Sequence, residues 1–288
     1  MSAYRFCRTD DIGLLVDALN RCWAPYFPEE PPETAASFKR SIRDLQVWCS
    51  SCMVAFSGRE AIGVLIGAKR PSGTLVHKIA VHPDHRRQGH GRHLLTSLSS
   101  KLAILGPPKI VAEVPETLAA AGELFSASGY IQETLLTDYV LKGPALGERS
   151  DAARVEGLVI PVTVNDLAAN GLLGEADQHV CWQRSAETLT ARKDDIEGLA
   201  IASDERIEAY VLYVSHGIKE TEILSLRSVI DDGGARVKQL LSQLATQGMR
   251  TFRFQKVHPA EISEAGLKTL GFSPSGRHLL YAARARSG

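Results

Sequence analysis

The segment from Thr74 to Leu105 constrains the fold of this chain most. An apolar, β-branched run from Leu75 to Val81 predicts a strand, and it ends near Pro83 because proline cannot donate to a ladder. A basic, glycine-rich stretch follows at residues 86–92. Leucines then recur at the spacing of an amphipathic helix, at Leu94, Leu95, Leu98, Leu102 and Leu105. The order is therefore strand, basic turn, helix.

This order predicts a site for a diphosphate. The first turn of a helix has backbone N–H groups without partners and the positive end of the helix dipole. Gly89 and Gly91 keep side-chain atoms away from the backbone, and three arginines supply charge-assisted hydrogen bonds. Neither the dinucleotide fingerprint nor the nucleotide P-loop pattern is present here. We therefore expect a cofactor whose diphosphate is bound by another motif.

The run Ile79-Ala-Val-His-Pro followed by Arg86-x-x-Gly89-x-Gly91 resembles motif A of the GNAT superfamily of acyl-CoA-dependent N-acetyltransferases. A later stretch, Ala121 to Tyr130, resembles the family's A-x-x-L-Y-x-x-x-G-[FY] pattern, so the resemblance covers about residues 3–142. It implies acetyl-CoA as cosubstrate, with the turn at the pyrophosphate and the strand beside the pantetheine arm. The residues so assigned are Ile79, Ala80, Val81, Arg86, Arg87, Gln88, Gly89, His90, Gly91 and Arg92.

Composition and net charge limit the classes of partner that the chain is expected to bind. Lys plus Arg and Asp plus Glu each number 33, so the net charge is zero and favours neither nucleic acid nor a membrane surface. No apolar segment reaches the ~20 residues of a membrane span. The five scattered cysteines are typical of a reducing cytoplasm, and Cys49 and Cys52 have no second pair with which to form a metal site. We expect a cytoplasmic protein without a metal.

The acceptor side is predicted from the loop between the first two helices. One helix is expected from Ile12 to Leu19 after a cap at residues 9–11, and the next from a Thr34 cap to Leu45. The four prolines between residues 23 and 32 exclude regular structure there. In the GNAT fold this connection borders the acceptor site. Trp23, Tyr26 and Phe27 are therefore either the acceptor wall or residues that pack the loop.

The second half of the chain reads as a degenerate copy of the first. A shift of 146 residues places Leu240, Leu241 and Leu244 on Leu94, Leu95 and Leu98, and residues 208–212 on 62–66. Under that shift Arg86, Gly89 and Gly91 become Asp232, Ala235 and Val237, which do not suit a phosphate, although Gly233-Gly234 would restore a glycine after a further shift.

The expected fold is α+β, with two tandem GNAT-like domains that each have a mixed, mostly antiparallel sheet flanked by helices. The domains are residues 1–143 and 157–288, joined by a linker at 144–156. The second domain would cover a sheet edge, shape the acceptor cleft or form a homodimer.

Two residues are candidate bases. Glu113 follows the motif helix on a strand and matches a glutamate that serves as base through water in some GNAT relatives. The alternative is a salt-bridged surface glutamate. His77 is the rival, because period two places it on one face with Leu75, Ile79 and Val81. The Val81 N–H is the expected oxyanion donor.

The resemblance does not identify a general acid in this sequence. Phe125 stands where the family has a proton-donating tyrosine, and Leu118 stands where an asparagine often contacts coenzyme A. Water, Ser126 or Tyr130 would take over, or the thiolate would leave unassisted.

The expected function is N-acetyl transfer from acetyl-CoA to a primary amine by direct attack in a ternary complex. A small-molecule acceptor is favoured over a protein N-terminus, because the aromatic loop and the second domain would enclose it. The alternative from another class is a non-catalytic acyl-CoA-binding sensor or scaffold, which the phenylalanine at position 125 motivates.

Overall fold

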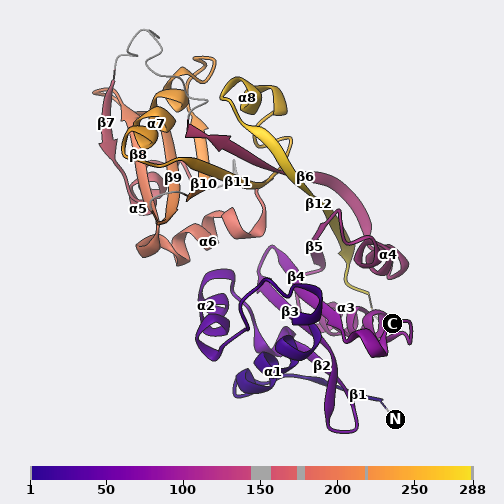
Figure 1. Ribbon diagram of the computed structural model, residues 1–288. Helices are drawn as coiled ribbons and strands as arrows, with labels where there is room; N and C mark the ends of the chain where they lie inside the picture. The colour runs from indigo at the N-terminus through magenta and orange to yellow at the C-terminus, as the bar shows by residue number, and fades with distance from the viewer. Residues whose placement is uncertain (1, 144–156, 174–178, 218–219, 287–288) are drawn as a thin grey trace. The chain divides into compact units, whose positions relative to one another are not determined.

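The computed structural model describes residues 2–143, 157–173, 179–217 and 220–286. The chain divides into two compact units (Figure 1). Unit 1 comprises residues 1–134 and 279–288, and unit 2 comprises residues 135–278. Within the described ranges, no helix is long and apolar enough to cross a membrane.

Unit 1 alternates strands and helices around one sheet. Its elements are β1 (Ser2–Phe6), α1 (Ile12–Cys22), α2 (Ala35–Leu45), β2 (Met53–Ser57), β3 (Glu60–Arg70), β4 (Gly73–Val81), α3 (His90–Leu105), β5 (Lys109–Pro115), α4 (Ala119–Ala127) and, from Leu279, β12 (Ser273–Arg284). The strand order is β1-β2-β3-β4-β5-β12. Neighbours from β1 to β4 are antiparallel, and β4 pairs with β5 in parallel, so the sheet is mixed and mostly antiparallel.

Helices α1 and α3 both contact β3 and cover opposite faces of the sheet (Figure 1). Leu94, Leu95, Leu98 and Leu102 of α3 pack into one core cluster with residues of β5 and α4, as the leucine spacing predicts. Leu105 is an exception, because its side chain is 67% exposed. It is the last residue of α3, and at that end the helix extends beyond the core that it covers.

A β-bulge in β4 changes the face assignment made from period two. Ile66 pairs with Lys78, whereas the next residue of β3, Gly67, pairs with Val76, so His77 is the extra residue of the bulge. As a result Val76 and Ile79, three residues apart, belong to the same core cluster. The parity argument that placed His77 on one face with Leu75, Ile79 and Val81 is therefore wrong, while a catalytic role for His77 stays a prediction.

The two helices on the acceptor side begin differently. Thr34 caps α2 as expected, since its side chain accepts from the Ser37 N–H and the Ser37 hydroxyl accepts from the Thr34 N–H. Asp11 precedes α1 but makes no side-chain cap bond. Its carboxylate accepts from Arg5 and from the Arg8 N–H instead. Between the helices, a single 3-10 turn at Ala24–Tyr26 interrupts an otherwise irregular loop.

From its second strand to its last helix, unit 2 repeats the order of elements that unit 1 has from β1 to α4. Its elements are β6 (Ile131–Lys142, from Leu135), β7 (Leu158–Pro161), α5 (Val164–Ala169), α6 (Ala186–Ala191), β8 (Glu197–Ala202), β9 (Ile207–His216), β10 (Glu220–Ser228), α7 (Ala235–Thr246), β11 (Thr251–Val257) and α8 (Glu264–Thr269). The strand order is β6-β11-β10-β9-β8-β7. The short elements from β7 to α6 supply counterparts of β1, α1 and α2 that the sequence did not reveal.

The two units do not have the bounds of the two predicted domains. The predicted linker at 144–156 lies outside the described residues. Residues 135–142, at the end of the predicted first domain, belong to unit 2, where β6 pairs with β11. Residues 279–286 belong to unit 1, where the Ala285 N–H donates to the Pro108 carbonyl at 2.7 Å. Each unit is thus completed by a strand that an alignment of halves assigns to the other.

All five cysteines are buried and free. Burial raises the pKa of Cys7 to about 12 and that of Cys22 to about 11, so both thiols stay protonated at neutral pH. The buried thiols of Cys49 and Cys52 likewise have raised pKa values. Across the described part of the chain, no group of three or more His, Cys, Asp or Glu side chains is arranged to hold a metal ion.

Candidate active site

The basic turn after β4 is open. Gly89 adopts φ of 84° directly before α3, and no atom lies within 4 Å of the position that a Cβ would take there. No side chain caps the start of α3. Arg86 and Arg87 are exposed beside it. The turn therefore offers uncapped backbone N–H groups and two guanidinium groups, a combination that suits a diphosphate.

Gly91 has a packing role in addition to the cofactor role predicted for it, which stays a prediction. It is buried, and a Cβ there would come within 2.9 Å of the Leu124 side chain of α4. The missing side chain lets α3 and α4 approach closely. Gly89 is thus the residue that opens the turn, while Gly91 is required for helix packing.

The His90 side chain points toward β1, where it contacts Tyr4. The Tyr4 hydroxyl lies 2.6 Å from His90 Nδ1, and the ring is 6% exposed. Burial, together with nearby His85 and His93, lowers the pKa of His90 below its usual value. His90 is therefore neutral near pH 7, and its side chain anchors the first turn of α3 to β1.

Strands β4 and β5 pair only at their beginnings, where Thr74 and Leu75 are in register with Ile110 and Val111. Both strands continue, β4 to Val81 and β5 to Pro115. The predicted cofactor residues Ile79, Ala80 and Val81 lie in the part of β4 beyond this pairing. An extended ligand can pair with backbone groups of a strand that diverges from its neighbour.

Tyr26 links the acceptor loop to the end of β4. Its hydroxyl donates to the Val81 carbonyl at 2.6 Å, and the guanidinium of Arg86 lies 5.9 Å from its ring centroid. Burial raises the pKa of Tyr26, so its hydroxyl keeps the proton that this bond requires. Tyr26 thus connects the loop predicted to border the acceptor with Val81 and Arg86, two of the predicted cofactor residues.

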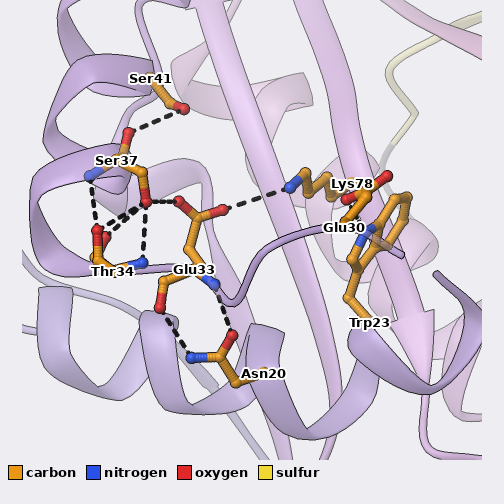
Figure 2. Close-up of polar contacts among 8 residues, drawn as sticks. All are labelled: Asn20, Trp23, Glu30, Glu33, Thr34, Ser37, Ser41 and Lys78. Atoms are coloured by element: carbon orange, nitrogen blue, oxygen red, sulfur yellow. Dashed lines mark hydrogen bonds and ion pairs between the residues drawn. The ribbon is translucent and has the colours of Figure 1, made fainter. Parts of the chain in front are cut away.

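A pocket lies between the acceptor loop, α1 and β4, and Trp23 and Phe27 form one wall of it. Their rings stack with centroids 4.4 Å apart. Glu30, Glu33 and Lys78 also line this pocket. Figure 2 shows Glu33 pointing toward the Lys78 ammonium, and Glu30 beside Trp23, to whose indole N–H it is bonded. Sequence reasoning missed these three charged residues, although a lysine within an apolar strand was a usable signal.

Glu113 lies on the same sheet face as this pocket. Ile110, Ala112 and Val114 of β5 belong to the core cluster beneath α3, so by alternation the half-buried Glu113 faces the other way. That face is covered by α1, whose Leu19 lines the pocket together with Lys78. The sequence choice of Glu113 as base agrees with this placement, and the role itself stays a prediction.

The position of the family's acid holds Phe125, which is buried against two tyrosines. The Tyr130 ring lies edge-on to it, and its buried hydroxyl has a raised pKa. Tyr281, from the end of the chain, stacks on Phe125 with centroids 5.7 Å apart. Ser126 is exposed. Leu118 lies just before α4 and packs against the core cluster.

Comparisons with known proteins agree with this architecture. Residues 14–130 match the family model described as Acetyltransferase (GNAT) family. A search of curated proteins found no match. A tandem GNAT protein from the clavulanic acid biosynthesis pathway is similar in structure, with TM-score 0.66, 16% identity and coverage of 100% of this chain and 99% of that one.

Two further solved structures are similar over the whole chain. The GCN5-related N-acetyltransferase from Sphaerobacter thermophilus has TM-score 0.66 and 15% identity, and the match covers 100% of this chain and 96% of that one. A putative acetyltransferase from Pyrococcus horikoshii has TM-score 0.64 and 18% identity, with coverage of 99% and 90%. The chain thus has the fold of two tandem GNAT-like domains, as the sequence predicts.

Proposed function

Because residues 14–130 belong to the GNAT acetyltransferase family, we propose that unit 1 transfers an acetyl group from acetyl-CoA to a primary amine. The observation that carries the proposal is the Tyr26 hydroxyl bonded to the Val81 carbonyl. It joins an aromatic pocket for the acceptor to the strand that leads into the open phosphate turn. Cofactor and acceptor would meet at the end of β4 in one ternary complex.

The chain's own groups divide the chemistry between them. The Arg86 guanidinium and the N–H groups at the start of α3 would bind the pyrophosphate, and backbone groups of Ile79 to Val81 would pair with the pantetheine arm. Acetyl-CoA supplies an activated thioester. Correct alignment of the two reactants contributes up to ~7–11 kcal/mol to such reactions.

Glu113 would accept the proton that the attacking ammonium must lose, directly or through water. The amine nitrogen then forms a bond to the carbonyl carbon and gives up its second proton to solvent. The carbon–sulfur bond breaks, and the thiolate takes up a proton from solvent, so the products are the amide and the free thiol. The Val81 N–H would stabilise the oxyanion. His77 remains the alternative base. We place no acid at Phe125, since its side chain has no proton to donate.

The acceptor proposed here is a small molecule. The pocket beside Trp23 and Phe27 is narrow and enclosed by a proline-rich loop, which suits a slender amine better than a folded protein terminus. The five buried, free cysteines suit a reducing compartment such as the cytoplasm.

The test is release of free thiol from acetyl-CoA with a panel of amines, amino acids and N-terminal peptides. We expect release with one class of amine, and about 100-fold weaker coenzyme A binding in Arg86→Glu, because a carboxylate beside the pyrophosphate replaces an attraction by a repulsion. Arg59→Glu, an exposed arginine in the β2–β3 turn, is the matched control and should bind normally. Unchanged coenzyme A affinity in Arg86→Glu would refute the phosphate assignment.

A non-catalytic acyl-CoA sensor is the second candidate, favoured by Phe125 alone. Glu113→Gln separates the two functions: an enzyme keeps its cofactor affinity and loses most of its turnover, whereas a sensor has no turnover to lose. Glu116→Gln, exposed just after β5, is the control for the change of charge. Tight acetyl-CoA binding without thiol release from any acceptor would favour the sensor.

A further inference from the structure

An ammonium group already occupies the acceptor pocket of unit 1. Lys78 Nζ lies 3.3 Å from Glu33 Oε2 and 5.3 Å from the centroid of the Trp23 ring (Figure 2). The side chains of Lys78 and Glu33 are 20% and 14% exposed. The pocket thus surrounds a cation with a carboxylate and an aromatic face, the two groups that bind ammonium ions best.

The carboxylate of Glu33 is held in place by its neighbours. The Asn20 amide receives a hydrogen bond from the Glu33 N–H at 2.7 Å and donates to the Glu33 carbonyl at 2.9 Å. The Ser37 hydroxyl donates to Glu33 Oε1, so Oε2 is the oxygen that faces Lys78. Such a carboxylate is preorganised and loses little side-chain entropy when a cation binds.

Glu30 adds a second negative charge and orients the aromatic wall. Its carboxylate accepts from Trp23 Nε1 at 3.0 Å, which fixes the ring that stacks on Phe27. Two glutamates and one lysine therefore line the pocket, whose formal net charge is −1, and Glu33 is the one paired with Lys78. An anionic group entering here would be repelled by both glutamates.

Lys78 is one of the residues that line the pocket, and little free space is left beside it. The free space is about 20 Å³, enough for about one water molecule. A ligand can enter only if the long, flexible lysine side chain moves out to solvent, as such side chains do. Glu33 then loses its cation, and a cationic ligand would replace that cation.

We propose that this pocket binds the distal ammonium of a diamine or polyamine acceptor, in the position that Lys78 Nζ holds. The proposal rests on acetyl transfer at the end of β4. Lys78 and Val81 are three steps apart along β4, about 10 Å of backbone at ~3.3 Å per residue, and we take that span for the distance between the acceptor's two amines. Lys78 acts as the resident counter-ion that the substrate replaces.

The experiment compares thiol release with four acceptors of one length: 1,8-diaminooctane, 8-amino-1-octanol, octylamine and 8-aminooctanoate. We expect the diamine to have at least about tenfold higher kcat/KM than the amino alcohol, and the amino acid to be the poorest. In Glu33→Gln the preference for the diamine should fall several-fold. Glu29→Gln, exposed in the same loop, should keep it. A diamine no better than the amino alcohol, or a preference for the amino acid, would overturn the proposal.

Calorimetric titration of 1,8-diaminooctane into the protein without acetyl-CoA tests the pocket independently of turnover. Lys78→Met should bind the diamine several-fold more tightly, because the competing ammonium is gone, and Glu33→Gln should bind it more weakly. If no acceptor releases thiol but these shifts occur, transfer is refuted and the pocket stands. If thiol is released and neither variant shifts diamine binding, the transfer stands and the diamine pocket is refuted.

Discussion

The two units build the same turn before the same helix and use it differently. Gly89 before α3 and Gly234 before α7 have φ of 84° and 85°. In unit 1 no side chain caps the helix. In unit 2 the Asp232 carboxylate accepts from the N–H groups of Gly234 and Arg236, both at 2.9 Å. A carboxylate of the chain itself therefore occupies the anion position of unit 2.

The gap between the parallel strands shows the same contrast. In unit 2, β10 and β11 pair at residues 220–223 and 251–254 and then part, as β4 and β5 do. The buried Arg184 reaches between them, donating to the carbonyls of Leu224, Gln255 and Lys256 and forming a bidentate pair with Glu261. In unit 2 three backbone carbonyls beyond the pairing thus accept from an arginine, whereas in unit 1 the Val81 carbonyl accepts from the Tyr26 hydroxyl.

Two side chains can occupy such a turn and strand gap while the backbone conformation stays the same. Unit 2 keeps the left-handed glycine, the helix and the parting strands. Asp232 and Arg184 satisfy from within what a diphosphate and an extended arm would satisfy from outside. We accordingly expect a single coenzyme A site per chain, in unit 1. The stability of unit 2 should not depend on whether coenzyme A is present.

The largest effect on the free energy of unfolding is expected from replacing Arg184, between β10 and β11 of unit 2. Arg184→Met leaves Glu261 and three carbonyls without the guanidinium, and breaking such a buried pair costs ~3–5 kcal/mol. Denaturant unfolding followed through Trp182 measures the change in the free energy of unfolding. Arg206→Met, in an exposed turn of the same unit, is the control and should change it little. Equal effects of the two variants would mean that Arg184 does not stabilise unit 2.

A comparable effect is expected in unit 1 from the last segment of the chain. Tyr281→Ala removes a ring that is 5% exposed and stacked on Phe125, at a cost of ~3–4 kcal/mol. Hydrogen exchange in α4 and β5 should accelerate, while α7 stays protected. Tyr281→Phe keeps the ring and should cost less than about 1 kcal/mol. Loss of protection in α7 instead of α4 would contradict the assignment of residues 279–288 to unit 1.

A smaller effect is expected at the second turn. Asp232→Ala removes the carboxylate from the start of α7 and should destabilise unit 2 by ~1–2 kcal/mol, the usual cost of losing a helix cap. Thermal unfolding measures it, with the exposed Asp231→Ala as control. The variant should still not bind coenzyme A, because Arg184 continues to occupy the gap between β10 and β11. Binding at a second site would show that Asp232 alone closes unit 2.

The smallest effect is a difference in acid sensitivity. The pKa of His90 is lowered on folding, so the unfolded chain binds the proton more readily and unit 1 loses stability as the pH falls below about 6.5. The pKa of Asp232 is also lowered: burial raises it, but hydrogen bonds from Arg236, Gly234 and Ser228 outweigh burial. Its contribution to unit 2 is intact above about pH 4 and is lost as the pH falls through the folded-state pKa.

Hydrogen exchange at each pH, corrected for the intrinsic rates, distinguishes the two helices. Protection of α3 should decline as the pH falls below about 6.5, while protection of α7 holds until about pH 4. His90→Gln should flatten the decline in α3, and His216→Gln, an exposed histidine of unit 2, should not. Parallel decline of both helices would contradict the assignment to His90.

Local structure was largely predictable. The Thr34 cap, the hairpin at residues 53–67, the motif strand and the four buried leucines of α3 are all as their local patterns indicate. The repeat was also visible, but the shift of 146 paired Gly89 with Ala235, whereas Gly234 has the matching conformation. One extra residue lies between the glycine and the first buried leucine in α7, and a constant offset cannot represent it.

The sequence by itself determined the order of elements in unit 1 and the glycine turn before α3, and it predicted the fold of GNAT-like domains, because periodicity, caps and glycine conformations act over a few residues. Only the tertiary structure decided which distant groups meet. Lys78 meets Glu33 across 45 residues, Arg184 meets Gln255 across 71, and Tyr281 completes the core around Phe125. Such pairs depend on strand register and on the path of the chain, and a single bulge at His77 changes which side chains face the pocket.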